Sequence, residues 1–121
     1  MKHSLDDSKP IYLQIKEQLE DAIVEKRLQT GDRVPSTNEF ASFYKINPAT
    51  AAKGINELVQ EDILFKRRGV GMFVKEDARQ KLVANRKKTF YENYILPLKN
   101  EAEILDISEE ELFHMLKGEN L

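Results

Sequence analysis

The amino-acid sequence predicts a mainly α-helical fold with one small β-hairpin. Apolar residues recur at helical spacing over most of the 121 residues. The exception is the segment 63–75, where two short apolar runs flank a glycine-bearing turn. Hydrophobic residues make up 40% and charged residues 33% of the chain, which is typical of a folded, fairly helical protein. We expect residues 1–76 to form a small domain and residues 77–121 a short helical tail.

The first helix is predicted over residues 10–28. Its apolar stripe includes Ile11, Ile15, Leu19 and Ile23. Pro10 suits a helix start, because the first turn of a helix leaves backbone N–H groups without partners. The segment 30–32, which contains a glycine, should end this helix.

Capping residues predict where the second and third helices begin. Ser36 and Glu39 form an S-x-x-E capping box, which opens a short helix that stops near residue 45. Asn47 is a favourable N-cap and Pro48 fits the first helical position, so a third helix should run to about residue 60.

The third helix is predicted to have a core face and a presented face. Four apolar residues fall together on one side: Ala51, Ile55, Leu58 and Val59. The opposite side carries Ala49, Lys53 and Asn56. Glycine inside a helix costs about 1 kcal/mol relative to alanine. We therefore expect Gly54 to permit close packing against the first or second helix.

The rest of the chain predicts a hairpin and then further helices. Two strands meet at a turn near Gly69, with Arg67 and Arg68 at its tip. From residue 77 the helical pattern returns, and Pro97 should kink or interrupt it. Ser108 and Glu111 form a second capping box before a last short helix.

Composition excludes most catalytic and metal-binding chemistry. The chain has no Cys, and His3 and His114 are its two imidazoles. No nucleophile, base and orienting group fall in an interpretable arrangement, so we expect no enzyme, no cofactor and no metal site. The amino terminus is polar and no apolar run approaches the length of a membrane span, which predicts a cytoplasmic protein.

The net charge of −2 hides two regions of opposite sign. Residues 33–75 hold 7 basic and 4 acidic side chains, a balance of +3. Residues 99–121 hold 2 basic and 7 acidic side chains, a balance of −5. The middle of the chain could therefore face phosphate, whereas the tail could not.

The order of elements fits a helix-turn-helix followed by a hairpin wing. The second and third helices are joined by a few residues around Asn47, and the hairpin comes next. In such a module the third helix enters the major groove of DNA, and the wing reaches the backbone or the adjacent minor groove. Lys53 and the wing arginines would then share one surface.

Four motifs carry a resemblance to a known family: residues 10–15 (PIYLQI), 31–36 (GDRVPS), 47–50 (NPAT) and 67–74 (RRGVGMFV). In this order they resemble the amino-terminal domain of the GntR family of bacterial transcription regulators, over about residues 8–74. The short tail and the Asn-Pro opening of the third helix look like the YtrA subfamily.

The resemblance implies a dimeric repressor that binds a palindromic operator, in some cases that of a transporter operon. The sequence names no small-molecule effector, and such a regulator can act without one. The family commonly has Arg two residues after the Ser of the Pro-Ser motif, where this chain has Asn38. Asn38 can hydrogen-bond to phosphate or base, but it cannot form the charged fork that Arg makes with guanine.

Candidate DNA-binding residues lie on the second helix, the third helix and the wing: Ser36, Asn38, Asn47, Ala49, Thr50, Lys53, Arg67, Arg68 and Gly69. Several of them also have a purely structural interpretation. Ser36 caps a helix, Thr50 can bond back to its own helix, and the arginines can be solvated charges on a hairpin edge.

Apolar residues of the tail are candidates for a dimer interface: Leu82, Phe90, Tyr94, Ile95, Leu98, Leu112, Phe113 and Leu116. The aromatic residues could instead line a ligand pocket, although a two-helix tail can hardly enclose one. His114 is expected to pack or lie at the surface rather than bind a metal.

The alternative function is that of a winged-helix module that binds proteins and not DNA. The negative net charge and the few basic residues of the third helix favour this alternative. The charge of the wing, Lys53 and the Pro-Ser and Asn-Pro motifs argue against it.

Overall fold

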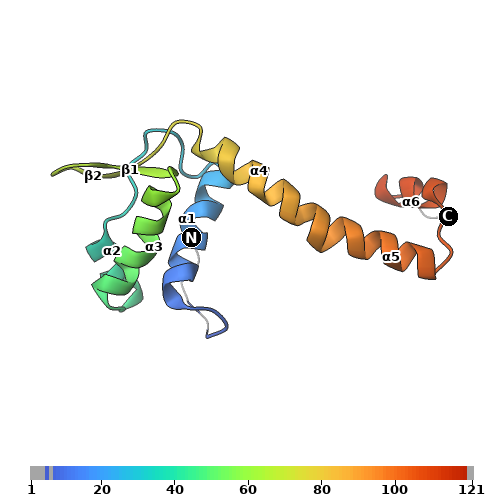
Figure 1. Cartoon of the computed structure of the whole chain (residues 1–121), viewed down its shortest axis with the longest axis horizontal. Coiled ribbons are helices and arrows are strands. Elements are labelled where there is room, and N and C mark those ends of the chain that lie inside the picture. Colours follow the sequence, from blue (N-terminus) through green and yellow to red (C-terminus); the bar gives the residue numbers. More distant parts are fainter. Residues whose placement is uncertain (1–4, 6, 120–121) are drawn as a thin grey trace. The chain divides into compact units, whose positions relative to one another are not determined.

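The computed structural model describes residue 5 and residues 7–119 (Figure 1). The elements follow the order α1 (Ile11–Val24), α2 (Thr37–Tyr44), α3 (Pro48–Gln60), β1 (Leu64–Arg67), β2 (Gly71–Val74), α4 (Ala78–Phe90), a π-helical turn η1 (Tyr91–Ile95), α5 (Leu96–Ile104) and α6 (Glu109–Leu116). The chain divides into two compact units, one up to Val83 and one from Ala84 onward. None of the helices in the described part of the chain is long and apolar enough to cross a membrane.

Helix α1 is shorter than predicted, because it ends at Val24 and not near residue 28. Lys26 has a φ of 66°, in the left-handed region, which turns the chain out of the helix. The N–H groups of Arg27 and Leu28 then both donate to the carbonyl oxygen of Ala22, at 2.8 and 3.0 Å. These bonds satisfy a carbonyl group that the end of the helix would otherwise leave unpaired.

Helices α2 and α3 have the predicted bounds because their predicted caps form. The Ser36 hydroxyl accepts from the N–H of Glu39, and the Glu39 carboxylate accepts from the N–H of Ser36. The Asn47 side chain accepts from the N–H of Ala49 at 2.8 Å, directly before Pro48.

The hairpin wing is a two-stranded antiparallel sheet, as predicted. Leu64 pairs with Val74 and Arg67 with Gly71, so Gly71 belongs to a strand and not to the turn. The segment 31–34 runs along the other edge of β2, which the sequence did not predict. Its contacts are backbone hydrogen bonds of 2.9 Å, from Val34 N–H to Met72 and from Val74 N–H to Asp32. The wing is thereby attached to the loop that leads into α2.

The core of the first unit lies between α1, α3 and the hairpin. Its largest fully buried side chains are Phe40, Ile15, Leu19, Ile23, Ile55, Leu58, Leu64, Val34 and Val74. Gly54 lets α3 approach α1, since a Cβ atom at this position would lie 2.4 Å from the Tyr12 carbonyl oxygen. This confirms the expected close packing and identifies α1 as the partner helix. Burying the apolar face of α3 leaves Ala49, Lys53 and Asn56 exposed, as predicted.

In the second unit, Pro97 interrupts the α-helical pattern, as expected. Proline has no N–H and its ring crowds the preceding turn. The chain responds with the π-turn η1, in which the N–H of Leu96 bonds to Tyr91, five residues earlier. Before α6, the Ser108 hydroxyl accepts from the N–H of Glu111 at 3.1 Å. Only this half of the predicted second capping box forms among the described residues.

Candidate nucleic-acid interface

A tight turn joins α2 to α3. Lys45 adopts left-handed angles, φ 55° and ψ 49°, and the N–H of Ile46 donates to Ala41 at 3.0 Å. Asn47 then caps α3, so only three residues separate the end of α2 from the start of α3. The short turn and the two caps fix the angle between the helices, as a helix-turn-helix requires.

The exposed side of α3 is small and polar near its start. Asn47 and Ala49 are exposed, and Thr50 is partly buried. Lys53 is exposed too, but its ammonium lies 4.0 Å from the ring centroid of Tyr12 in α1. Such a cation–π contact limits the directions that the lysine side chain samples. Tyr12 is therefore a neighbour of the presented face that sequence reasoning missed.

The start of α2 carries Ser36 and Asn38. Asn38 is exposed, whereas Ser36 is half-buried and engaged in the capping box. Hydrogen bonds from the backbone and side chain of Ser36 lower the pKa of Glu39, and the positive charge of Arg33 lowers it further. An ionised Glu39 at neutral pH keeps the capping box closed.

The wing presents the two predicted arginines. The Arg67 guanidinium lies 5.3 Å from the ring centroid of Phe73, and Arg68 is exposed in the turn. Gly69 follows with a φ of 76°, a conformation that costs glycine little and other residues more. The turn therefore brings the backbone of the wing tip and two cations to the surface together.

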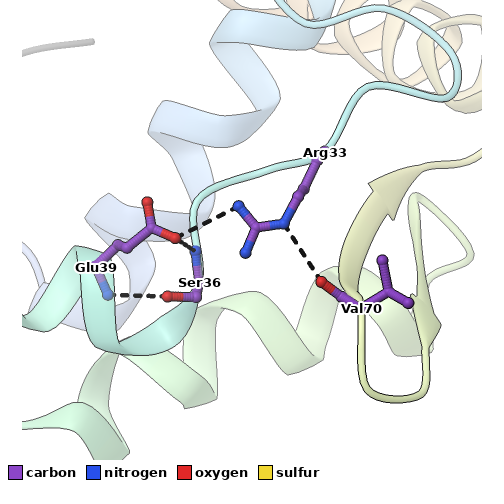
Figure 2. Close-up of polar contacts among 4 residues, drawn as sticks. All are labelled: Arg33, Ser36, Glu39 and Val70. Atoms are coloured by element: carbon purple, nitrogen blue, oxygen red, sulfur yellow. Dashed lines mark hydrogen bonds and ion pairs between the residues drawn. The ribbon is translucent and has the colours of Figure 1, made fainter.

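Arg33 is a further cation of this surface. It is not among the DNA-binding residues predicted from the sequence. Figure 2 shows its guanidinium between the wing and the start of α2. Nε lies 3.4 Å from the carbonyl oxygen of Val70, and Nη1 lies 3.5 Å from Oε1 of Glu39. The sequence placed Arg33 inside the GDRVPS motif, but only the fold shows that the wing reaches it.

Seven of the eight candidate interface residues belong to the second unit, where four of them are exposed: Phe90, Tyr94, Phe113 and Leu116. The other three are partly buried: Ile95, Leu98 and Leu112. Leu82 differs, because it is 5% exposed and packs in the core of the first unit. A residue buried in this core is not available to a second chain, so the structure removes Leu82 from the interface candidates.

Metal ligands do not cluster in the described part of the chain. No group of three or more His, Cys, Asp or Glu side chains could hold an ion there. His114 is partly buried and its Nδ1 lies 2.5 Å from Oε2 of Glu119. His3 lies outside the described residues.

Comparison with known proteins agrees with this geometry. A sequence model described as bacterial regulatory proteins, gntR family, matches residues 11–74. The chain belongs to the GntR family. It is 32% identical to the HTH-type transcriptional repressor YtrA of Bacillus subtilis over 110 residues, which are 91% of this chain and 84% of YtrA. It is 41% identical to the regulator YhcF of the same organism over 78 residues, 64% of this chain and 64% of YhcF. The match thus covers less than two thirds of YhcF.

Solved structures share the fold of this GntR-family chain. A GntR family transcriptional regulator from Listeria monocytogenes has a TM-score of 0.75 and 31% identity, with 96% of this chain and 100% of that chain covered. The AraR DNA-binding domain in complex with operator ORE1 has a TM-score of 0.53 and 26% identity, with 61% of this chain and 93% of that chain covered. The predicted winged helix-turn-helix is confirmed, and the chain is a transcription regulator with a DNA-binding fold.

Proposed function

We propose that this GntR-family regulator is a dimeric repressor that binds a palindromic operator. The observation that supports the proposal most directly is the common location of three features in the first unit: the presented face of α3, the capped start of α2 and the basic wing. The AraR domain, which has the same fold, was solved with operator DNA. YtrA, which aligns with 91% of this chain, is named a repressor.

The proposed DNA contacts divide between base edges and backbone. Ala49, Thr50 and Lys53 lie in the first turns of α3, the part of a recognition helix that meets base edges in the major groove. Further proposed contacts come from Asn47, which caps α3, from Ser36, which caps α2, and from Asn38 in the first turn of α2. The wing residues Arg67, Arg68 and Gly69 would contact phosphates or the minor groove, because cations and exposed backbone near a tight turn suit both.

The exposed apolar surface of the second unit supports the proposed dimer. Tyr94 is 64% exposed and Leu116 71% exposed, and the rings of Phe90 and Tyr94 lie 5.4 Å apart. Large apolar groups at such exposure are typical of surfaces that associate. A two-fold axis would place two first units on half-sites about one helical turn of DNA apart, or a multiple of it. This is why we propose a palindromic operator.

A transporter operon is the proposed target, and no small-molecule effector is needed for the mechanism. Bound at a promoter, a dimer would repress by blocking RNA polymerase. Among the relatives, MngR of Escherichia coli is named a transport and metabolism system repressor; it is 29% identical to this chain over 69 residues, which are 57% of the chain and 29% of MngR.

The test is a fluorescence-anisotropy titration of the full chain against DNA from its own promoter region. A scrambled fragment of equal length is the control, and both are measured at two salt concentrations. Tight, salt-sensitive binding to the promoter fragment alone is expected, because phosphate contacts release counterions and base contacts discriminate sequence. No binding to either fragment at low salt would contradict the proposal and favour the protein-binding module.

A further inference from the structure

Arg33 joins two elements that flank the proposed DNA surface. Its Nε faces the carbonyl oxygen of Val70 in the wing turn at 3.4 Å, and its Nη1 faces Oε1 of Glu39 in α2 at 3.5 Å (Figure 2). The same Glu39 oxygen accepts from the backbone N–H of Ser36 at 3.2 Å. One side chain therefore connects the tip of the wing to the capping box of α2.

The backbone around Arg33 supports this connection. Arg33 forms an isolated antiparallel bridge with Phe73, so its Cα is held beside β2. The guanidinium then crosses over Gly71, where a Cβ atom would lie 2.9 Å from Arg33 Nε. Any side chain at position 71 would press against the guanidinium. The absence of a side chain at Gly71 gives Arg33 the room to reach Val70.

We propose that Arg33 is a positioning residue for DNA binding, which holds the wing turn against the start of α2 and thereby sets where Arg67 and Arg68 meet the DNA. This inference rests on the proposed function. A guanidinium suits the role, because its donors lie in one rigid plane and can serve two acceptors at once. Lysine has the same charge, but its three donors share a single nitrogen, so it cannot present two coplanar donor nitrogens to Val70 and Glu39 as the guanidinium does.

Arg33 is expected to affect the position of the wing turn more than the stability of the fold. The Arg33 and Glu39 side chains are about half exposed, at 48% and 56%, and exposed ion pairs contribute little to folding. Losing the bridge should leave the fold intact and free the wing turn to move. The affinity for DNA should then fall, because a mobile wing must be ordered before its arginines can bind.

The experiment compares Arg33→Gln and Arg33→Lys in the full chain by anisotropy titration with promoter DNA. Both variants are expected to raise the Kd about five- to tenfold, because neither reproduces the two coplanar donor nitrogens that face Val70 and Glu39. Their melting temperatures should stay within about 4 °C of the wild type. Arg27→Gln is the matched control: it removes the same charge from an exposed pair with Glu25 at 3.2 Å, and should bind like the wild type.

A double-mutant cycle separates positioning from direct contact. In a background that carries Arg67→Gln and Arg68→Gln, Arg33→Gln should change the Kd by less than about twofold, since the wing contacts are already lost. The full five- to tenfold loss in that background, or wild-type affinity of Arg33→Lys, would overturn the positioning role and make Arg33 a direct charge on DNA. A wild-type chain that binds no promoter DNA would overturn the proposed function as well, so the wild-type titration distinguishes the two failures.

Discussion

Gly54→Ala is the substitution whose effect the packing of α1 on α3 predicts most directly. In an unpacked helix this change would stabilise the protein by about 1 kcal/mol, because alanine is a better helix former than glycine. Here the new methyl group would lie 2.4 Å from the carbonyl oxygen of Tyr12, and 3.4 Å from Cβ of Ile15 and from the backbone nitrogen of Lys16. Ordinary contact begins at 3.4 Å, so the two helices must separate locally by about an ångström.

The net change in stability depends on the gain in helix propensity and on the cost of the clash with Tyr12. The atom that obstructs the methyl group belongs to the backbone of α1 and cannot rotate away. Overpacking of a well-packed core costs about 1–3 kcal/mol, and a backbone clash belongs at the upper end of that range. After subtraction of the gain in helix propensity, we expect Gly54→Ala to lower the free energy of unfolding by about 1–2 kcal/mol.

Urea denaturation followed by circular dichroism measures this difference. The midpoint should fall with little change in the m-value, since the same surface is exposed on unfolding. Asn56→Ala is the control, because it raises helix propensity on the exposed side of the same helix, where no neighbour opposes it. Its effect should stay within about 0.5 kcal/mol. A Gly54→Ala protein as stable as the wild type would refute the claim that this contact fixes α3 on α1.

Three further predictions concern the cap, the wing and the tail. Glu39 should titrate below the ordinary range of glutamate in an NMR pH series, because the Ser36 backbone N–H, the Ser36 hydroxyl and Arg33 all lower its pKa, and Ser36→Ala should raise that midpoint. With the folded pKa depressed, the cap stabilises α2 at neutral pH and this contribution is lost as the pH falls through the folded pKa. Arg68→Ala should weaken binding to all DNA sequences and reduce the salt slope by about 1, so an unchanged slope would remove Arg68 from the phosphate contacts. Leu116→Glu should shift sedimentation toward a monomer, whereas Asn100→Glu, which adds the same charge at an exposed position of α5, should not; a dimeric Leu116→Glu protein would argue against the tail interface.

Much of the fold could be predicted because its signals are local. The starts of α2 and α3 depend on hydrogen bonds that span two or three residues, from Ser36 to Glu39 and from Asn47 to Ala49. The core face of α3 repeats at helical spacing, and Pro97 disturbs only the turns beside it. In each case the interacting groups are close along the chain.

Other features depend on segments that meet only in the folded protein. The end of α1 at Val24 depends on Lys26, which adopts a left-handed conformation. No sequence pattern predicted this conformation. Leu82 followed the apolar pattern of the tail, but packing placed it in the first unit. Apolar periodicity tells which face of a helix is buried, but not what buries it.

The amino-acid sequence alone predicts the winged helix-turn-helix, the order of its elements and the basic character of the wing. How these parts are held together depends on contacts that form only in the folded chain. The contact of Gly54 with Tyr12, the cation–π contact of Lys53 and the bridge from Arg33 to Val70 each join residues at least 37 positions apart. The physical reason is that such contacts depend on the path of the whole backbone, whereas a cap or a helical repeat depends on a few neighbouring dihedral angles.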